Sequence, residues 1–196
     1  MASTAVLAPR GDRVVLADLI PMRDTRVRDL ALVLGGAGLT GLAAQVSIPV
    51  PHSPVPVTGQ TFGVLLVGAA LGSRRALAAM ALYLLAGLAG MPWFAGGTSG
   101  SVHLPTFGYL IGFVLAAGLV GRFAERGADR SVRRTVLLMA AGNVVIYALG
   151  VTWLSFAAHL SLGTAVSLGL TPFLLGDAIK IALASGLLPA AWRLAR

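Results

Sequence analysis

The sequence predicts an all-α membrane protein, a bundle of six transmembrane helices with both termini on the cytoplasmic side. Three observations predict it: an apolar composition, six apolar segments near the length of a membrane span, and cations confined to alternate joints. Of the 196 residues, 57% are hydrophobic and 11% are charged, whereas soluble domains carry about 25% charged residues. The composition therefore excludes a soluble globular domain.

The six segments are read from the runs of apolar residues, because a helix needs about 20 of them to cross roughly 30 Å of hydrocarbon. They are residues 30–48, 57–72, 76–90, 107–123, 135–154 and 171–192. The second and third are short and rich in Gly and Ala, which predicts tilt or close helix packing. No joint is large enough to fold alone, so residues 30–196 are expected to form one transmembrane domain in the lipid bilayer.

The cations lie at alternate ends of these segments. They precede the first, join the second to the third and the fourth to the fifth, and follow the sixth: Arg23, Arg26, Arg28, Arg74, Arg75, Arg122, Arg126, Arg130, Arg133, Arg134, Arg193 and Arg196. By the positive-inside rule these joints and both termini are cytoplasmic. Residues 1–29 are then a cytoplasmic lead-in, of which the first twenty or so are expected to be poorly ordered. The net charge of +8 reflects topology, and no nucleic-acid partner is expected.

The three joints without Lys or Arg have an unusual composition. Residues 49–56 are proline-rich, residues 91–106 are glycine-rich with an aromatic pair, and residues 155–170 are apolar enough to lie in the membrane interface or re-enter it. We therefore expect a ligand pocket near the outer face.

The sixth segment carries two charged residues, Asp177 and Lys180, and Lys180 is the only lysine of the chain. Each costs on the order of 2.5–3.5 kcal/mol to insert near the centre of a membrane helix. At a spacing of three they share a helix face and can neutralise each other, but two leucines would insert more easily. We interpret the pair as a carboxylate acceptor and an ammonium donor for a polar ligand; mutual neutralisation alone is the alternative.

The sequence lacks the residues that several mechanisms require. There is no cysteine, which excludes disulfides and thiolate metal sites, and no P-loop motif for ATP hydrolysis. His52, His103 and His159 stand apart in the outer joints, so no metal site is expected. A rhomboid-like intramembrane serine protease is a remote alternative, because "GTSG" at residues 97–100 matches G-x-S-G and His159 could serve as the base of Ser99.

A stand-alone, gradient-driven carrier is the other alternative to a partner-driven protein. It would take and release a proton at Asp177 near neutral pH. The adjacent Lys180 argues against this, because a nearby cation favours the ionised carboxylate.

Four stretches together resemble the BioY family, the biotin-specific substrate-binding (S) component of energy-coupling factor (ECF) transporters. They are "AQVSIPVPHSPVPVTGQTFGVLLVGAALG" at residues 44–72, "YLLAGLAGMPWFAGGTSG" at 83–100, "PTFGYLIGF" at 105–113 and "GDAIK" at 176–180. They occur in the expected order along the chain, and jointly they are specific for the family.

The resemblance implies a protein of the bacterial cell membrane that is not an enzyme and uses no cofactor. It would capture biotin from outside and dock on a transmembrane coupling (T) subunit, which is driven by two cytoplasmic ATPases. It implies that Asp177 accepts the ureido N–H groups of biotin, and that Lys180 donates to the ureido carbonyl or another polar group. The other implied contacts are a glycine-rich loop and aromatic side chains: Gly96, Gly97, Thr98, Ser99, Trp93, Phe94 and Tyr109. For the aromatic residues, anchoring at the membrane interface is the alternative.

The first span carries a face of small residues at spacings of four. They are Gly36, Ala37, Thr40, Gly41 and Ala44. Such faces let helices approach closely, and the resemblance implies that this one contacts the coupling subunit. Packing against another span of the same chain is the alternative.

Overall fold

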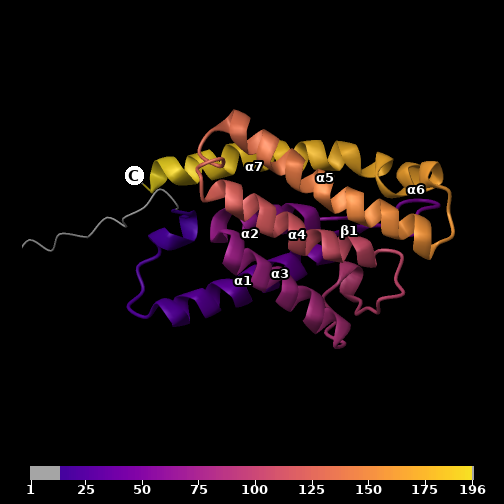
Figure 1. Cartoon of the computed structure of the whole chain (residues 1–196), viewed down its shortest axis with the longest axis horizontal. Helices are drawn as coiled ribbons and strands as arrows, with labels where there is room; N and C mark the ends of the chain where they lie inside the picture. The colour runs from indigo at the N-terminus through magenta and orange to yellow at the C-terminus, as the bar shows by residue number, and fades with distance from the viewer. Residues whose placement is uncertain (1–13, 196) are drawn as a thin grey trace, which may run out of the picture.

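The computed structural model describes residues 14–195, which form a bundle of α-helices with a short β-ribbon (Figure 1). In chain order the elements are η1 (Leu16–Leu19), α1 (Thr25–Gln45), β1 (Ser47–Ile48), β2 (Val57–Thr58), α2 (Gln60–Leu71), α3 (Ser73–Leu88), η2 (Ala95–Gly97), α4 (Phe107–Ala124), α5 (Val132–Ala157), α6 (Leu162–Gly169), η3 (Thr171–Phe173) and α7 (Leu174–Leu194), where η denotes a 3-10 turn. The predicted all-α class is confirmed. Residues 1–13 of the predicted lead-in, and Arg196 among the predicted cytoplasmic cations, lie outside the described residues.

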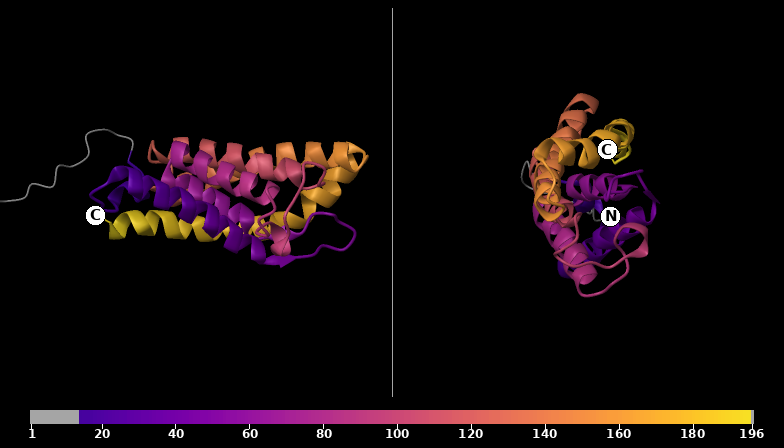
Figure 2. Two further views of the ribbon diagram at one scale, coloured as in Figure 1. Left: turned by 90° about the horizontal axis from the view of Figure 1, so that it is seen from below. Right: turned by 90° about the vertical axis from the view of Figure 1, so that its right-hand side faces the viewer.

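The long helices run lengthwise, and α4 is central because it packs against α2, α3 and α5 (Figures 1 and 2). α1 covers α2 and α3 on one side, while α7 packs against α5 and α2 on the other. The cationic joints, η1 and the end of α7 gather at one end of the bundle, and α6 lies at the opposite end. The cationic joints and the joints without Lys or Arg therefore lie at opposite ends of the bundle, as the charge pattern predicts.

Each predicted span corresponds to a helix, but the helices differ in length. By length and hydropathy, α1, α4, α5 and the stretch Leu162–Leu194, which contains α6, η3 and α7, can each cross a membrane. α2 has 12 residues and α3 has 16, or about 18 and 24 Å at 1.5 Å per residue. Both are shorter than the roughly 30 Å of a hydrocarbon core. The chain breaks between them at Gly72, whose φ of +79° is the left-handed conformation that glycine adopts freely.

The chain is ordered further toward its N-terminus than the sequence suggested. α1 begins at Thr25 because Asp24 caps it, accepting the N–H groups of Arg26 at 2.8 Å and Val27 at 3.3 Å. Val15 and Ala17 are buried in the core. The expectation of poor order up to about residue 20 is therefore wrong for residues 14–20.

Ionic contacts hold this N-terminal segment in place. The guanidinium of Arg75 lies 2.8 Å from Asp18 and 2.9 Å from Asp29, so one arginine ties η1 to the start of α1. Arg130 donates to the carbonyl of Val14 at 3.2 Å. The segment before α1 is thus attached to both cationic joints.

The small-residue face of α1 packs inside the chain, which corrects its assignment to a coupling subunit. Gly36, Ala37, Thr40, Gly41 and Ala44 are all buried. A Cβ on Gly36 would lie 3.1 Å from side chains of α2 and α3. The small residues serve the close approach of these neighbouring helices. The opposite side of α1 is the exposed one and carries larger residues: Leu34, Leu39 and Leu42.

A buried acid in the joint between α4 and α5 holds the end of α7. Asp129 is fully buried, and its Oδ2 accepts the indole N–H of Trp192 at 2.6 Å. The guanidinium of Arg130 lies over the same indole, 4.6 Å from the ring centroid. Burial raises the pKa of Asp129 above its ordinary value, while the Trp192 hydrogen bond and Arg130 oppose the shift.

The ionised Asp129 therefore lowers the stability of the folded chain at neutral pH, and this cost is relieved as pH falls through the raised pKa. Asp129→Asn keeps an acceptor for Trp192 and removes the charge, so its thermal unfolding midpoint in detergent should be no lower than that of wild type. Asp129→Ala leaves the indole N–H unpaired and should lose about 1–3 kcal/mol. Asn and Ala variants with equally lowered midpoints would show that the carboxylate charge itself stabilises the joint.

Candidate functional site

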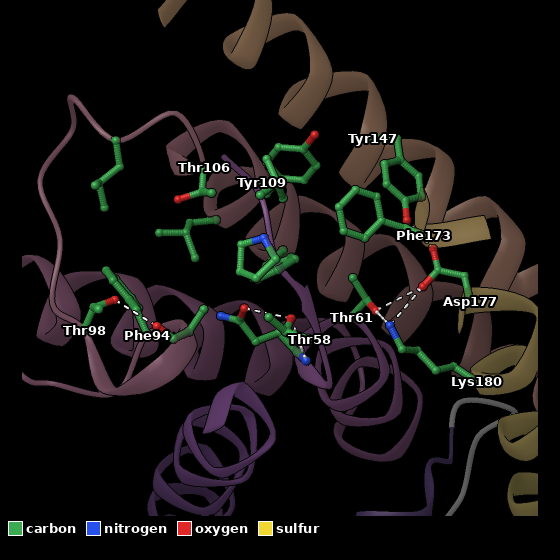
Figure 3. Close-up of a pocket in the computed structure, with 17 residues that line it drawn as sticks. Thr58, Thr61, Phe94, Thr98, Thr106, Tyr109, Tyr147, Phe173, Asp177 and Lys180 are labelled. Carbon is green, nitrogen blue, oxygen red and sulfur yellow. Dashed lines mark hydrogen bonds and ion pairs between the residues drawn. The ribbon is translucent and has the colours of Figure 1, made fainter. Parts of the chain in front are cut away.

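The bundle contains a pocket of about 650 Å³, its open mouth included (Figure 3). It lies toward the α6 end, because its lining residue Tyr109 bonds to Gly169 at the end of α6. Its walls come from the segment around β2 and the start of α2, the loop containing η2, and α4, α5, η3 and α7. The lining residues are Val55, Pro56, Thr58, Gln60, Thr61, Phe94, Ala95, Thr98, Leu104, Thr106, Tyr109, Leu110, Phe113, Tyr147, Phe173, Asp177 and Lys180. The pocket is thus built from segments that are far apart in the sequence.

The charged pair forms one end of this pocket. Asp177 lies in the first turn of α7, where the helix dipole favours a carboxylate, and is 4% exposed. Lys180 Nζ lies 3.1 Å from Asp177 Oδ1 and donates to Thr61 Oγ1 at 2.8 Å. Thr61 also bonds to Oδ1 at 3.4 Å, and the Tyr147 hydroxyl donates to Oδ2. Figure 3 shows these four side chains converging at one end of the pocket.

These contacts leave the pair with some unused hydrogen-bonding capacity. A carboxylate offers about four acceptor sites and an ammonium group three donors. Asp177 accepts from Lys180, Thr61 and Tyr147, and Lys180 donates to two acceptors. The pocket end can therefore both accept and donate one further hydrogen bond without rearrangement.

A buried polar relay supports the middle of the pocket. Gln60 is 5% exposed, donates to the Tyr83 hydroxyl at 2.7 Å and accepts from Thr58 at 3.0 Å. Tyr83 in turn donates to the carbonyl of Trp93 at 3.1 Å. This relay fixes the loop containing η2 against α2 and α3.

The remaining wall is mainly apolar and aromatic. Phe94, Phe113 and Phe173 are buried around the pocket. Tyr109 offers its ring, because its hydroxyl donates to the carbonyl of Gly169 at 2.7 Å. A pocket with a charged end and an apolar body suits a small molecule that has a polar head and an apolar remainder.

Some of the residues predicted as ligand contacts line this pocket and others do not. Asp177, Lys180, Tyr109, Phe94 and Thr98 line it. The residues that do not are Trp93, Gly96, Gly97 and Ser99, of which the last three are exposed in the loop.

These four residues have local structural positions. Trp93 packs against Tyr83 with ring centroids 5.1 Å apart, and its indole N–H donates to the Tyr83 carbonyl at 3.0 Å. Gly96 and Gly97 have φ values of +66° and +74°, which let the loop turn so that Phe94 N–H bonds to the Thr98 carbonyl at 2.8 Å. In the described part of the chain Ser99 makes no hydrogen bond to His159, so the serine–base arrangement of a protease is not assembled there.

Several lining residues were not among the predicted ligand contacts, chiefly Gln60, Thr61, Tyr147 and Phe173. The polar run T-G-Q-T at residues 58–61, where an apolar helix begins, was a usable signal for the first two. Tyr147 had no comparable signal, because its partner Asp177 lies 30 positions away in the sequence.

The comparisons with known proteins agree with the family resemblance. The model of the BioY family matches residues 17–196. "Biotin transporter BioY2" of Lactococcus lactis subsp. cremoris is 35% identical over 162 residues, covering 81% of this chain and 87% of that protein. "Biotin transporter BioY" of Thermotoga maritima is 40% identical over 140 residues, covering 70% and 81%. The predicted family is confirmed.

A solved structure has the same fold. The crystal structure of the S-component for biotin from an ECF-type ABC transporter superposes with a TM-score of 0.78 at 24% sequence identity, covering 89% of this chain and 95% of that one. The bundle of Figure 1 is therefore a fold already seen in a membrane transport component.

Proposed function

The chain belongs to the BioY family, and from this premise we propose that it is the biotin-binding S component of an ECF transporter. The observation that carries the proposal is the Asp177–Lys180 pair at the end of an otherwise mainly apolar pocket, with its charged groups 3.1 Å apart and its carboxylate buried. Relatives with 35% and 40% identity are named biotin transporters. A binding role, with no catalytic step of its own, accounts for both the charged pair in the pocket and the names of the relatives.

Biotin has the chemistry that this pocket can hold. Its ureido head carries two N–H donors and a carbonyl acceptor, so Asp177 can accept an N–H group and Lys180 can donate to the carbonyl. The thiophane ring and alkyl chain would then lie along the apolar wall that includes Phe94, Tyr109 and Phe173.

The proposed membrane arrangement follows from the charges. The end of the bundle that carries η1, the cationic joints and the end of α7 would face the cytoplasm, so that the pocket opens outward. Six helices would then cross the bacterial cell membrane, with α2 and α3 packed within the bundle where their short length is tolerated. Residues 1–29 would remain on the cytoplasmic side.

The energy for uptake would come from other subunits. The sequence contains no P-loop motif, so we assign ATP hydrolysis to two cytoplasmic ATPases acting through a transmembrane T component. Because the small-residue face of α1 is internal, docking would use another surface, of which the exposed side of α1 with Leu34, Leu39 and Leu42 is one candidate.

A titration of the purified chain with biotin, in detergent and without partner subunits, tests the binding role. We expect saturable one-to-one binding by calorimetry, with an affinity that varies little between about pH 6 and 8, as for a site whose function involves no proton transfer.

The same titration separates the proposal from its alternatives. Steep pH dependence together with proton-coupled uptake by proteoliposomes that contain only this chain would support the gradient-driven carrier through Asp177. Absence of binding by demonstrably folded protein would refute the proposal.

A further inference from the structure

Asn143 is a buried polar residue of α5 that the proposed ligand contacts do not use. It is 7% exposed, and its Oδ1 atom has no hydrogen-bond partner among the described residues. Leaving a buried acceptor unsatisfied destabilises the folded chain. An apolar side chain would avoid this cost in a membrane helix, so the presence of Asn143 needs a physical reason.

A small cavity joins Asn143 to the charged end of the pocket. This cavity lies between α2, α5 and α7 and has room for about one water molecule. Its lining residues are Thr61, Phe62, Leu65, Met139, Asn143, Lys180 and Ile181. Thr61 and Lys180 line both this cavity and the ligand pocket. Lys180 is the one charged side chain in the cavity lining, so Asn143 shares a space with the ammonium group that holds Asp177.

Hydrogen-bond capacity at Asp177 limits what a ligand can gain there. Oδ1 already accepts from Lys180 and Thr61, and Oδ2 accepts from Tyr147. One ligand N–H can join Oδ2 without rearrangement, but a ureido ligand that donates to Oδ1 competes with the ammonium group for that atom. An ammonium group that loses its carboxylate in a buried site needs another acceptor, because an unpaired buried charge is strongly unfavourable.

We propose that Asn143 is the second acceptor of Lys180, a positioning residue that receives the ammonium group when the ligand engages Asp177. The inference rests on the proposed biotin-binding function. Asn143, Lys180 and Thr61 line the same cavity, so the amide oxygen of Asn143 is the acceptor offered to the ammonium group there. Asn143 thereby lowers the free-energy cost of breaking the Lys180–Asp177 ion pair when the ligand binds Asp177.

The single lysine of the chain allows a direct test. Lysine labelled with ¹³C at Cε, in a chain with a lysine-free tag, gives one Cε signal, which reports the position of Lys180 with and without biotin. We expect saturating biotin to shift this signal in both proteins, because Lys180 also faces the ureido carbonyl. The shift should differ in size between wild type and Asn143→Leu, which has similar bulk but no acceptor. The biotin Kd of Asn143→Leu should rise about tenfold, which is 1.4 kcal/mol. Asn143→Asp, which keeps an acceptor oxygen, should restore both the shift and the affinity.

Controls separate this inference from a general effect on folding. Thr152→Val removes a different polar group of α5, whose hydroxyl bonds only within the helix, to the Ala148 carbonyl at 2.6 Å, and should leave the signal and the Kd unchanged. Asn143→Ala serves if the leucine variant does not fold. An identical lysine shift in wild type and Asn143→Leu, or a Kd change below twofold, would overturn the inference while biotin binding by wild type still stands. Wild type that fails to bind biotin would instead refute the proposed function.

Discussion

Asp177→Ala is expected to abolish biotin binding while the protein still inserts and folds. A hydrogen bond to a charged group contributes about 1.5–3 kcal/mol, so losing the one from the ureido head should lower affinity at least about tenfold. Lys180 also loses its ion-pair partner. Asp177 is 4% exposed and its partners are fixed, so water cannot readily replace the carboxylate. Calorimetry on the purified variant, with size-exclusion chromatography to check folding, measures the effect.

The matched control is the double variant Asp177→Leu/Lys180→Leu. Replacing a buried ion pair by apolar residues of similar volume is often neutral or stabilising, so the double variant should fold at least as well as Asp177→Ala. It should nevertheless bind no biotin. Binding retained by the double variant would mean that the two charges only neutralise each other, and a loss below about tenfold for Asp177→Ala would mean that the carboxylate does not contact the ligand.

The charged end of the site was predictable because it violates a strong local rule. Charges are costly in a membrane helix, so Asp177 and Lys180 stand out in an apolar segment whatever the rest of the chain does. The contacts that complete the site come from α2 and α5. Thr61 and Tyr147 are ordinary residues of their own helices, and only tertiary packing brings them to the carboxylate.

The helices of the fold were predictable where local composition determines them, and their packing partners were not. Long apolar helices such as α4 and α5 follow from hydropathy alone. The small residues of α1 predicted close packing, but a small-residue face does not specify its partner, and it proved to be α2 and α3. The α6 helix was unpredicted, because the apolar joint of residues 155–170 was interpreted only as a segment that lies in the membrane interface or re-enters it. Ser161 caps this helix by accepting Thr164 N–H at 3.2 Å.

The order before α1 also depended on distant residues. Asp18 and Asp29 lie in the segment predicted as a cytoplasmic lead-in, and both pair with Arg75 at the start of α3. Ion pairs across such a separation leave no pattern along the chain. Residues that are atypical for their own segment, such as charges in a membrane helix, are therefore predictable from the sequence. Residues whose role depends on contacts with distant parts of the chain are not.

Gly150→Ala is expected to distort the ligand pocket, although Gly150 itself does not line it. A Cβ on Gly150 would lie 2.3 Å from the Tyr109 ring, well inside contact distance. Tyr109 is 7% exposed, and its hydroxyl is held by the Gly169 carbonyl. The ring can yield only by breaking that hydrogen bond and moving into the pocket, where it would occupy the apolar wall proposed for the thiophane ring and alkyl chain.

We expect Gly150→Ala to weaken biotin binding at least about tenfold and to lower the thermal midpoint, since overpacking costs roughly 1–3 kcal/mol. Gly186→Ala on α7 is the matched control, because a Cβ there meets nothing within 4 Å. It makes the same chemical change inside a helix and should preserve affinity and raise stability by up to about 1 kcal/mol. Equal affinities for the two variants would show that Tyr109 does not form the wall of the ligand site, and the alkyl chain would then have to lie against the loop containing Phe94.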